Sequence, residues 1–160
     1  MKLNVGCGRD IREGYVNLDF RDIEGVNIVC DMLKEDIPLD DNSVDEILAK
    51  DILEHFMLAD TDMILKKWYR VLRPKGWLQI EVPNTMLNVG EFLAGTTKCA
   101  KGQDIAERFS QIMYGKQDYP GNCHYQLFDE KRLQDVCEKA GFIHIKTWTY
   151  GRALCVQVKK

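Results

Sequence analysis

Two glycines and two carboxylates stand at the ends of successive apolar runs near the start of the chain. Gly6 and Gly8 follow the run LNV, Asp19 ends the run YVNLD, and Asp31 follows the run VNIVC. Because glycine lacks a Cβ atom, a Gly-x-Gly pair allows a sharp turn after a strand and a close approach of the backbone to a ligand. A carboxylate at the end of a neighbouring strand can accept hydrogen bonds from a ribose diol. The spacing predicts one nucleoside laid across three strand ends.

The elements that position these residues are short apolar runs of strand character, interrupted by one clear helical pattern. Continuous apolar runs suit strands that are buried on both faces of a parallel sheet. Asp129 is expected to cap a late helix that Gly141 closes, and two final strands follow, separated by a segment that suits a hairpin. The expected strands are Leu3–Val5, Tyr15–Leu18, Val26–Cys30, Val44–Ala49, Trp77–Val82, Phe142–Thr149 and Ala153–Val158, with the main helix within Ile52–Arg73.

This order of elements predicts the α/β class, as a Rossmann-like, doubly wound, mostly parallel seven-stranded sheet ending in an antiparallel hairpin. Residues 1–160 are expected to form a single domain. Residues 84–126, with one amphipathic helix at Asp104–Tyr114, are expected to be a substrate-side insertion or lid. The connections Gly8–Tyr15 and Phe20–Gly25 are shorter than parallel crossovers usually are. These shortened N-terminal crossovers are either irregular loops or the sign of a different strand order.

Composition limits the kinds of partner. Acidic residues outnumber basic ones, 25 to 22, which gives no electrostatic footprint for nucleic acid or for an anionic membrane. The basic side chains of residues 66–75 are expected to form a solvated helix face. The six cysteines form no Cys-x-x-Cys pair and predict reduced thiols in a cytoplasmic protein. Missing crossover helices would leave one sheet face bare, so the insertion or the second subunit of a homodimer is expected to cover it.

The succession of motifs resembles the class I S-adenosylmethionine-dependent methyltransferases, in particular the small methyltransferase type 11 group. The resemblance spans residues 3–84, and a further segment resembles the one that precedes the last two strands of that group. The motifs are VGCG, YVNLD, VCDMLKEDIPLDDNSVDEILAKDILEHF and RVLRPKGWLQIEVPN, followed by CHYQLFDEKRLQDVCEKAGF.

The resemblance implies S-adenosyl-L-methionine as the cofactor and methyl transfer to an unidentified, small-molecule acceptor as the activity. It implies that the glycine motif lines the methionine part, that Asp19 holds the ribose hydroxyls, and that Asp31 accepts from the adenine amino group. It also implies that the Met32 backbone N–H reaches the adenine ring and that residues 50 and 51 face the methionine amino group. The implied cofactor-binding residues are Gly6, Cys7, Gly8, Asp19, Phe20, Asp31, Met32, Leu33, Lys50 and Asp51.

Two histidines are candidate catalytic residues, because a hydroxyl or phenol acceptor must lose a proton and imidazole takes one near neutral pH. His55 follows Asp51 by one helical turn at the mouth of the expected site. His124 lies where the insertion returns to the core. Each either touches the acceptor or is a packing residue. His144 alternates with isoleucines in a late strand and is expected to be structural.

Two neighbours of these histidines, Glu54 and Cys123, could take part in other chemistry. Glu54 either binds a substrate cation or is a solvent-facing helix carboxylate, and the second interpretation is favoured. Cys123 and His124 are adjacent, so on extended chain their side chains point apart, and no further ligands follow at a metal-binding spacing. No metal site is therefore expected.

Two alternative functions remain open at this stage. A nicotinamide-dependent oxidoreductase also begins with a strand, glycines and a strand-ending carboxylate. It requires a third glycine and a helix after the motif, which the segment following Gly8 does not offer. A non-catalytic S-adenosylmethionine-binding module would keep the fold without methyl transfer.

Overall fold

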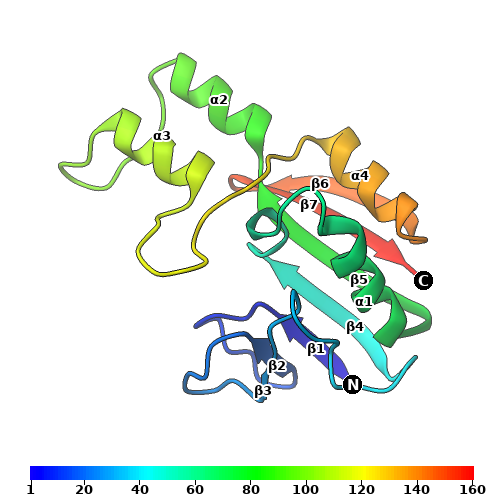
Figure 1. Cartoon of the computed structure of the whole chain (residues 1–160). Helices are drawn as coiled ribbons and strands as arrows, with labels where there is room; N and C mark the ends of the chain where they lie inside the picture. The colour runs from blue at the N-terminus through cyan, green and yellow to red at the C-terminus, as the bar shows by residue number, and fades with distance from the viewer.

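The computed structural model describes residues 1–160 and contains one seven-stranded sheet with five helical segments (Figure 1). The strands are β1 (Lys2–Val5), β2 (Val16–Asp19), β3 (Ile28–Val29), β4 (Val44–Lys50), β5 (Leu72–Pro83), β6 (Ile143–Tyr150) and β7 (Ala153–Lys159). The helices are the 3₁₀ turn η1 (Leu53–His55), α1 (Thr61–Val71), α2 (Thr85–Leu93), α3 (Ile105–Tyr114) and α4 (Glu130–Lys139).

The strand order is β3-β2-β1-β4-β5-β7-β6. Strands β1 to β5 pair in parallel, and β7 lies antiparallel between β5 and β6. This arrangement confirms the expected Rossmann-like, mostly parallel sheet with a final hairpin. The order reverses between β1 and β4, and in such folds ligands bind at the carboxyl ends of the strands beside that point.

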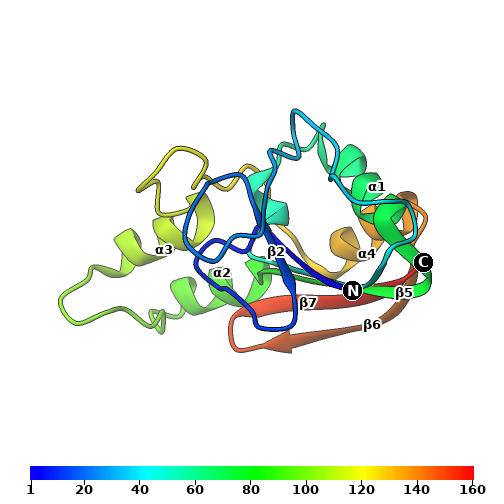
Figure 2. The same cartoon turned by 90° about the horizontal axis from the view of Figure 1, so that it is seen from below.

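Helices α1 and α4 cover the same face of the sheet (Figure 2). Helix α1 buries Ile64, Leu65 and Trp68 completely, because these apolar residues fall on one stripe of a 3.6-residue period. They join the core of 27 buried residues. The chain leaves α1 in extended conformation at Leu72, as expected shortly before a proline.

The expected helix Ile52–Arg73 is wrong in its first part, where the structure has the 3₁₀ turn η1 and irregular chain. The carbonyls of Leu53 and Phe56 accept hydrogen bonds from the side chain of Gln126, at 3.1 and 3.0 Å. These contacts with a distant residue favour a turn, and α1 begins only at Thr61.

The short connections of the front half are irregular loops, and the strand order is unchanged. The loop after Gly8 packs on the sheet face opposite α1 through two buried asparagines, Asn4 and Asn17. Asn4 Nδ2 donates to the Asp10 carbonyl at 2.8 Å, and Asn17 Oδ1 accepts from the Arg12 N–H at 3.0 Å. The asparagine side chains satisfy backbone groups that a helix would satisfy internally. The loop therefore covers part of the face that was expected to need a partner, at β1 and β2.

The insertion contains one helix more than expected. Helix α2 begins after Asn84, whose Oδ1 accepts the Leu87 N–H at 3.1 Å, and α3 begins after Asp104, whose Oδ1 accepts two backbone N–H groups. Both helices stand beyond the carboxyl ends of the strands instead of covering a sheet face (Figure 1). No helix in the chain is both long and apolar enough to cross a bilayer.

Candidate functional site

A cavity of about 560 Å³ lies at the carboxyl ends of β1, β2 and β4. All ten residues that the sequence analysis assigned to cofactor binding line it. They come from the loop after β1, the end of β2, the loop after β3 and the end of β4. The structure thus brings together Gly6, Cys7, Gly8, Asp19, Phe20, Asp31, Met32, Leu33, Lys50 and Asp51.

The glycine motif turns the chain at the floor of this cavity. Gly6 and Gly8 have φ angles of 63° and 53°, in the left-handed region that glycine tolerates best. A Cβ atom at Gly6 would lie 2.5 Å from the side chain of Ile52. A larger residue at this position would collide with Ile52. Because glycine has no side chain, the backbone of this turn itself lines the cavity.

Asp19 is buried and already bonded within the chain. Its Oδ2 accepts the Gly8 N–H at 2.7 Å, and its Oδ1 accepts the N–H and the Nε of Arg21, each at 3.0 Å. The guanidinium of Arg21 also stacks over the ring of Tyr119, 4.4 Å from its centroid. Asp19 therefore links the glycine turn to an arginine that the sequence analysis did not select.

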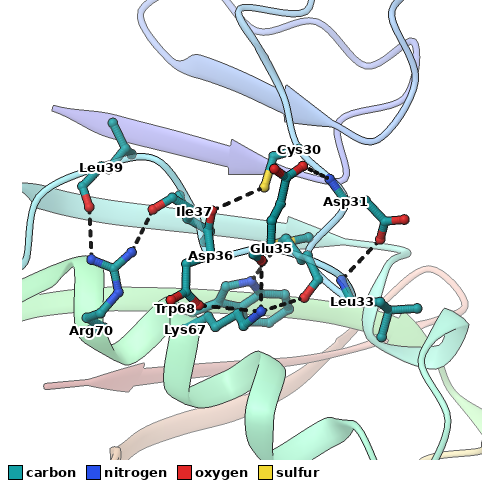
Figure 3. Close-up of polar contacts among 11 residues, drawn as sticks. Cys30, Asp31, Leu33, Glu35, Asp36, Ile37, Leu39, Lys67, Trp68 and Arg70 are labelled. Atoms are coloured by element: carbon teal, nitrogen blue, oxygen red, sulfur yellow. Dashed lines mark hydrogen bonds and ion pairs between the residues drawn. The ribbon is translucent and has the colours of Figure 1, made fainter.

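Asp31 and Met32 line the cavity and begin the loop that follows β3. Figure 3 shows Asp31 at the start of this loop. Asp31 Oδ1 accepts the Leu33 N–H at 3.1 Å, and its Oδ2 lies 2.7 Å from Lys34 Nζ. The ammonium of Lys34 lowers the pKa of the Asp31 carboxyl from its usual value. The Met32 backbone N–H has no acceptor within the chain. A carboxylate beside a free N–H can pair with the edge of an adenine ring.

Helix α1 holds this loop through two basic side chains (Figure 3). Lys67 Nζ donates to the carbonyls of Met32 and Glu35, at 3.0 and 2.8 Å, and the Arg70 guanidinium donates to those of Ile37 and Leu39, at 2.6 and 2.9 Å. The expectation of a solvated basic face is wrong for these two residues. They supply hydrogen-bond donors to a loop that has few partners of its own.

A second cavity, of about 840 Å³, adjoins the first and reaches under the insertion. Most of its lining is polar or charged, with Asn88, Arg108, Gln111 and Arg152 among the residues that the sequence analysis did not identify. No local motif marks these positions. Both cavities share Gly8, Arg9, Arg21, Asp51, His55 and Tyr119.

Both candidate catalytic histidines line the second cavity, and their rings meet edge to face with centroids 4.8 Å apart. His55 comes from η1 and His124 from the irregular segment that returns from the insertion to the core. Burial lowers the pKa of His55, and burial together with the neighbouring His55 lowers the pKa of His124 to about 4. Both imidazoles are therefore neutral near pH 7.

Glu54 lies beside them and is 1% exposed, so the expectation of a solvent-facing carboxylate is wrong. Its Oε1 is 4.0 Å from His124 Nε2, and neither carboxylate oxygen has a hydrogen-bond partner in the chain. Burial, with a further contribution from Asp51, raises the pKa of the Glu54 carboxyl well above its usual value. Sequence reasoning missed this burial because the covering segment, residues 124–126, lies far along the chain.

The insertion is joined to η1 by hydrogen bonds at its returning end. The Tyr125 N–H donates to the Glu54 carbonyl at 2.8 Å, and Gln126 Nε2 donates to Thr61 Oγ1 at 2.9 Å in addition to the two carbonyls of η1. Few aromatic residues of the insertion line the cavities: Phe92 and Phe109 stack on each other, and Tyr114 is exposed. Tyr119 lines both cavities.

His144 lies outside the site. Its Nε2 is 2.8 Å from Thr147 Oγ1 and 3.4 Å from Gln134 Nε2, which agrees with a structural role. The six cysteines are free. Burial and the nearby Asp19 raise the pKa of Cys7, the cysteine of the glycine motif, to about 11.

Comparisons with known proteins agree with this architecture. Residues 3–80 match the family model described as a methyltransferase domain. A search of curated proteins finds no match. Among solved structures, the chain is similar to Burkholderia thailandensis 1,6-didemethyltoxoflavin-N1-methyltransferase with bound 1,6-didemethyltoxoflavin and S-adenosylhomocysteine. The TM-score is 0.67 at 16% identity, over 99% of this chain and 70% of that one.

Two further structures are similar to the same extent. One is a SAM-dependent methyltransferase from Archaeoglobus fulgidus, with a TM-score of 0.65 at 15% identity over 99% of this chain and 85% of that one. The other is a possible histamine N-methyltransferase from Thermotoga maritima, with a TM-score of 0.65 at 17% identity over 99% and 81%. At these identities the likeness shows a common fold.

Proposed function

Because the chain belongs to the class I S-adenosylmethionine-dependent methyltransferases, we propose that it methylates a polar small molecule held in the larger cavity. S-adenosylmethionine is its cofactor, and its sulfonium supplies an activated methyl group. The observation that carries the proposal is the junction of the two cavities at Asp51, His55 and Tyr119. A methyl donor in the smaller cavity and an acceptor in the larger one would meet there.

The cofactor-side roles follow from the residues that line the smaller cavity. Gly6, Cys7 and Gly8 give the methionine part room against the backbone. Asp31 accepts from the adenine amino group, and the free Met32 N–H donates to the ring. Asp19 holds the ribose hydroxyls and must share its oxygens with Arg21, which already occupies them.

At the end of β4, Lys50 and Asp51 face the amino group of the methionine part. Asp51 has a φ angle of 49°, and it lines both cavities. A carboxylate at this position attracts an ammonium group and helps to hold the methyl donor in line with the acceptor.

The acceptor-side roles rest on the polar lining and on the two neutral imidazoles. A cavity rich in amide and charged groups suits an acceptor with several hydrogen-bonding atoms. His55 and His124 present electron pairs that activate the acceptor atom as it loses its proton. The 1,6-didemethyltoxoflavin bound by the Burkholderia thailandensis protein supports a small-molecule acceptor.

The proposal is tested by two measurements on the purified full chain. Isothermal titration with S-adenosylhomocysteine measures cofactor-site binding, and mass spectrometry measures S-adenosylhomocysteine formed from S-adenosylmethionine with a panel of hydroxyl and heterocyclic N–H acceptors. We expect micromolar binding and acceptor-dependent turnover. Binding without turnover on any acceptor would favour the non-catalytic module, and fluorescence gain from added NADH would favour the oxidoreductase.

Three further predictions concern the type of partner, the oligomeric state and the cellular location. The polar cavity supports a small molecule over a nucleic acid. A homodimer stays a prediction, tested by sedimentation at micromolar concentration, although the loop over Asn4 and Asn17 removes one reason for it. A cytoplasmic location rests on the six free cysteines and is tested by localising the tagged protein.

A further inference from the structure

Three side chains beside the junction of the cavities bring possible metal-ligand atoms close together. One ligand atom from each of Glu54, His55 and His124 can be chosen so that all three lie within 4.8 Å of one another. The first two residues lie in η1 after β4, and the third belongs to the returning segment of the insertion, which is neither helix nor strand. The site therefore exists only when the insertion packs on η1.

The Glu54 carboxylate lacks any partner in the chain. It is 1% exposed, and neither oxygen accepts a hydrogen bond. Buried carboxylates are normally paired, hydrogen-bonded or bound to a metal. The one basic nitrogen within 4.0 Å of it is His124 Nε2, at 4.0 Å, which is beyond a hydrogen bond. The carboxylate thus has room for a cation.

Hydrogen bonds to the backbone determine the tautomer of both imidazoles. His55 Nδ1 lies 3.1 Å from the Gly121 carbonyl oxygen, and His124 Nδ1 lies 3.0 Å from the Ile112 carbonyl oxygen. A carbonyl can only accept, so each Nδ1 carries the proton and each Nε2 carries the lone pair. Metal-binding histidines are oriented in this way, with the second ring nitrogen donating to a backbone carbonyl.

We propose that Glu54, His55 and His124 bind one divalent ion of the first transition row, such as Zn²⁺, whose open positions face the acceptor cavity. Two imidazoles and one carboxylate are a ligand set for such ions, whereas Mg²⁺ prefers oxygen ligands alone. Ligand atoms about 2.1 Å from a tetrahedral ion lie roughly 3.4 Å apart. From separations of up to 4.8 Å, the ligand atoms must therefore close by up to about 1.4 Å when the ion binds.

The binding of the ion does not depend on the proposed function. Only the assignment of its open coordination positions to the methyl acceptor rests on that function. A bound ion lowers the pKa of a coordinated hydroxyl, so the acceptor would reach the methyl donor as a stronger nucleophile. His55 and His124 then act as ligands, and the proton leaves to solvent. No metal site was expected because Cys123 and His124 point apart on extended chain and no further ligands follow them at a metal-binding spacing. Glu54 and His55, which meet His124 in the structure, lie far from it along the chain.

The test begins with the metal alone. The full chain is stripped with chelator and titrated with Zn²⁺ by calorimetry and with Co²⁺ by visible absorption, which reports imidazole coordination. We expect one ion per chain at micromolar affinity or better. Glu54→Gln, His55→Ala and His124→Ala should each weaken binding at least tenfold and remove the increase in melting temperature that Zn²⁺ gives the original protein.

Matched controls exclude other metal-binding groups. His144→Ala and Cys123→Ser should bind Zn²⁺ as the original protein does, since His144 lies outside the site and Cys123 is not in the ligand set. Circular dichroism identifies variants that fail to fold, and any one folded ligand variant is sufficient. Binding lost in Cys123→Ser, binding unchanged in folded His124→Ala, or binding of Mg²⁺ alone would overturn the proposal.

Turnover separates this inference from the proposed function. If turnover is equal with and without chelator and no Zn²⁺ binds, the metal site is excluded and the methyltransferase proposal stands. Zn²⁺ binding at the three residues without turnover on any acceptor supports the metal site and counts against the assigned acceptor.

Discussion

The two cavities adjoin, but the chain builds their walls in opposite ways. The lining of the smaller cavity, which we call the cofactor wall after its proposed role, comes mostly from residues 4–51, where consecutive strand ends and short loops bring the residues together. The lining of the larger cavity, the acceptor wall, comes mostly from η1 and from residues 84–126, with further residues from the loop after β1 and from the β6–β7 hairpin. The first wall follows from local patterns, and the second depends on a few long-range hydrogen bonds.

The largest expected effect concerns the lining of the larger cavity, which depends on long-range hydrogen bonds. Gln126→Leu removes the hydrogen bonds that Nε2 donates to Leu53, Phe56 and Thr61, and the one that Oε1 accepts from Arg132. It leaves buried acceptors unpaired. We expect the free energy of unfolding to fall by about 3 kcal/mol in a urea titration. Gln157→Leu is the control, because that side chain is half-buried on β7 and is bonded to no other residue. Equal stability of the two variants would mean that Gln126 does not hold the insertion.

The next effect concerns the cofactor wall. Asp19→Ala removes the acceptor for Gly8 and Arg21 and the proposed ribose partner. Affinity for S-adenosylhomocysteine should fall by roughly 1 to 3 kcal/mol, measured by calorimetry. Asp22→Ala, which changes an exposed carboxylate in the same loop, should leave the affinity unchanged. An unchanged affinity in Asp19→Ala would place the ribose elsewhere.

A smaller effect tests how the adenine loop is held. Lys67→Met removes the donors to the Met32 and Glu35 carbonyls and should weaken S-adenosylhomocysteine binding by about 1 kcal/mol. Lys66→Met is the matched control, because Lys66 pairs only with Asp62 on the surface of α1. If both variants have the same affinity for S-adenosylhomocysteine, the loop keeps its conformation without Lys67.

The smallest expected effect is a difference in reactivity between Cys7, in the lining of the smaller cavity, and Cys99, in the insertion, as pH rises. Cys7 has a pKa raised to about 11 by burial and by Asp19, whereas Cys99 in the insertion is exposed. At pH 8 to 9 iodoacetamide should label Cys99 first and Cys7 slowly, as measured by peptide mass spectrometry. Because the folded state keeps the Cys7 proton at a pH where the unfolded state loses it, stability should decline as pH rises above about 9. Faster labelling of Cys7 than of Cys99 would show that the cofactor wall opens readily.

The fold could be predicted from the sequence because its signals are local. Seven strands, the positions of α1, α3 and α4, and the hairpin follow from apolar periodicity, caps and breakers. Helix α2 was missed although Asn84 caps it, since Gly90 and a weak apolar stripe obscure it. The turn η1 was missed because Gln126 determines it from the other end of the insertion.

By itself the sequence determined the strand-end residues of the cofactor wall, because parallel strands place their carboxyl ends on one edge whatever the loops do. Only the tertiary structure decided three features: the burial of Glu54, the meeting of His55 with His124, and the hold of Arg21 on Asp19. The first two depend on the segment around residue 124, which is distant along the chain, whereas the third depends on the side-chain conformation of Arg21, two residues after Asp19. Burial and long-range pairing change the charge state and partners of a group without leaving a local pattern in the sequence.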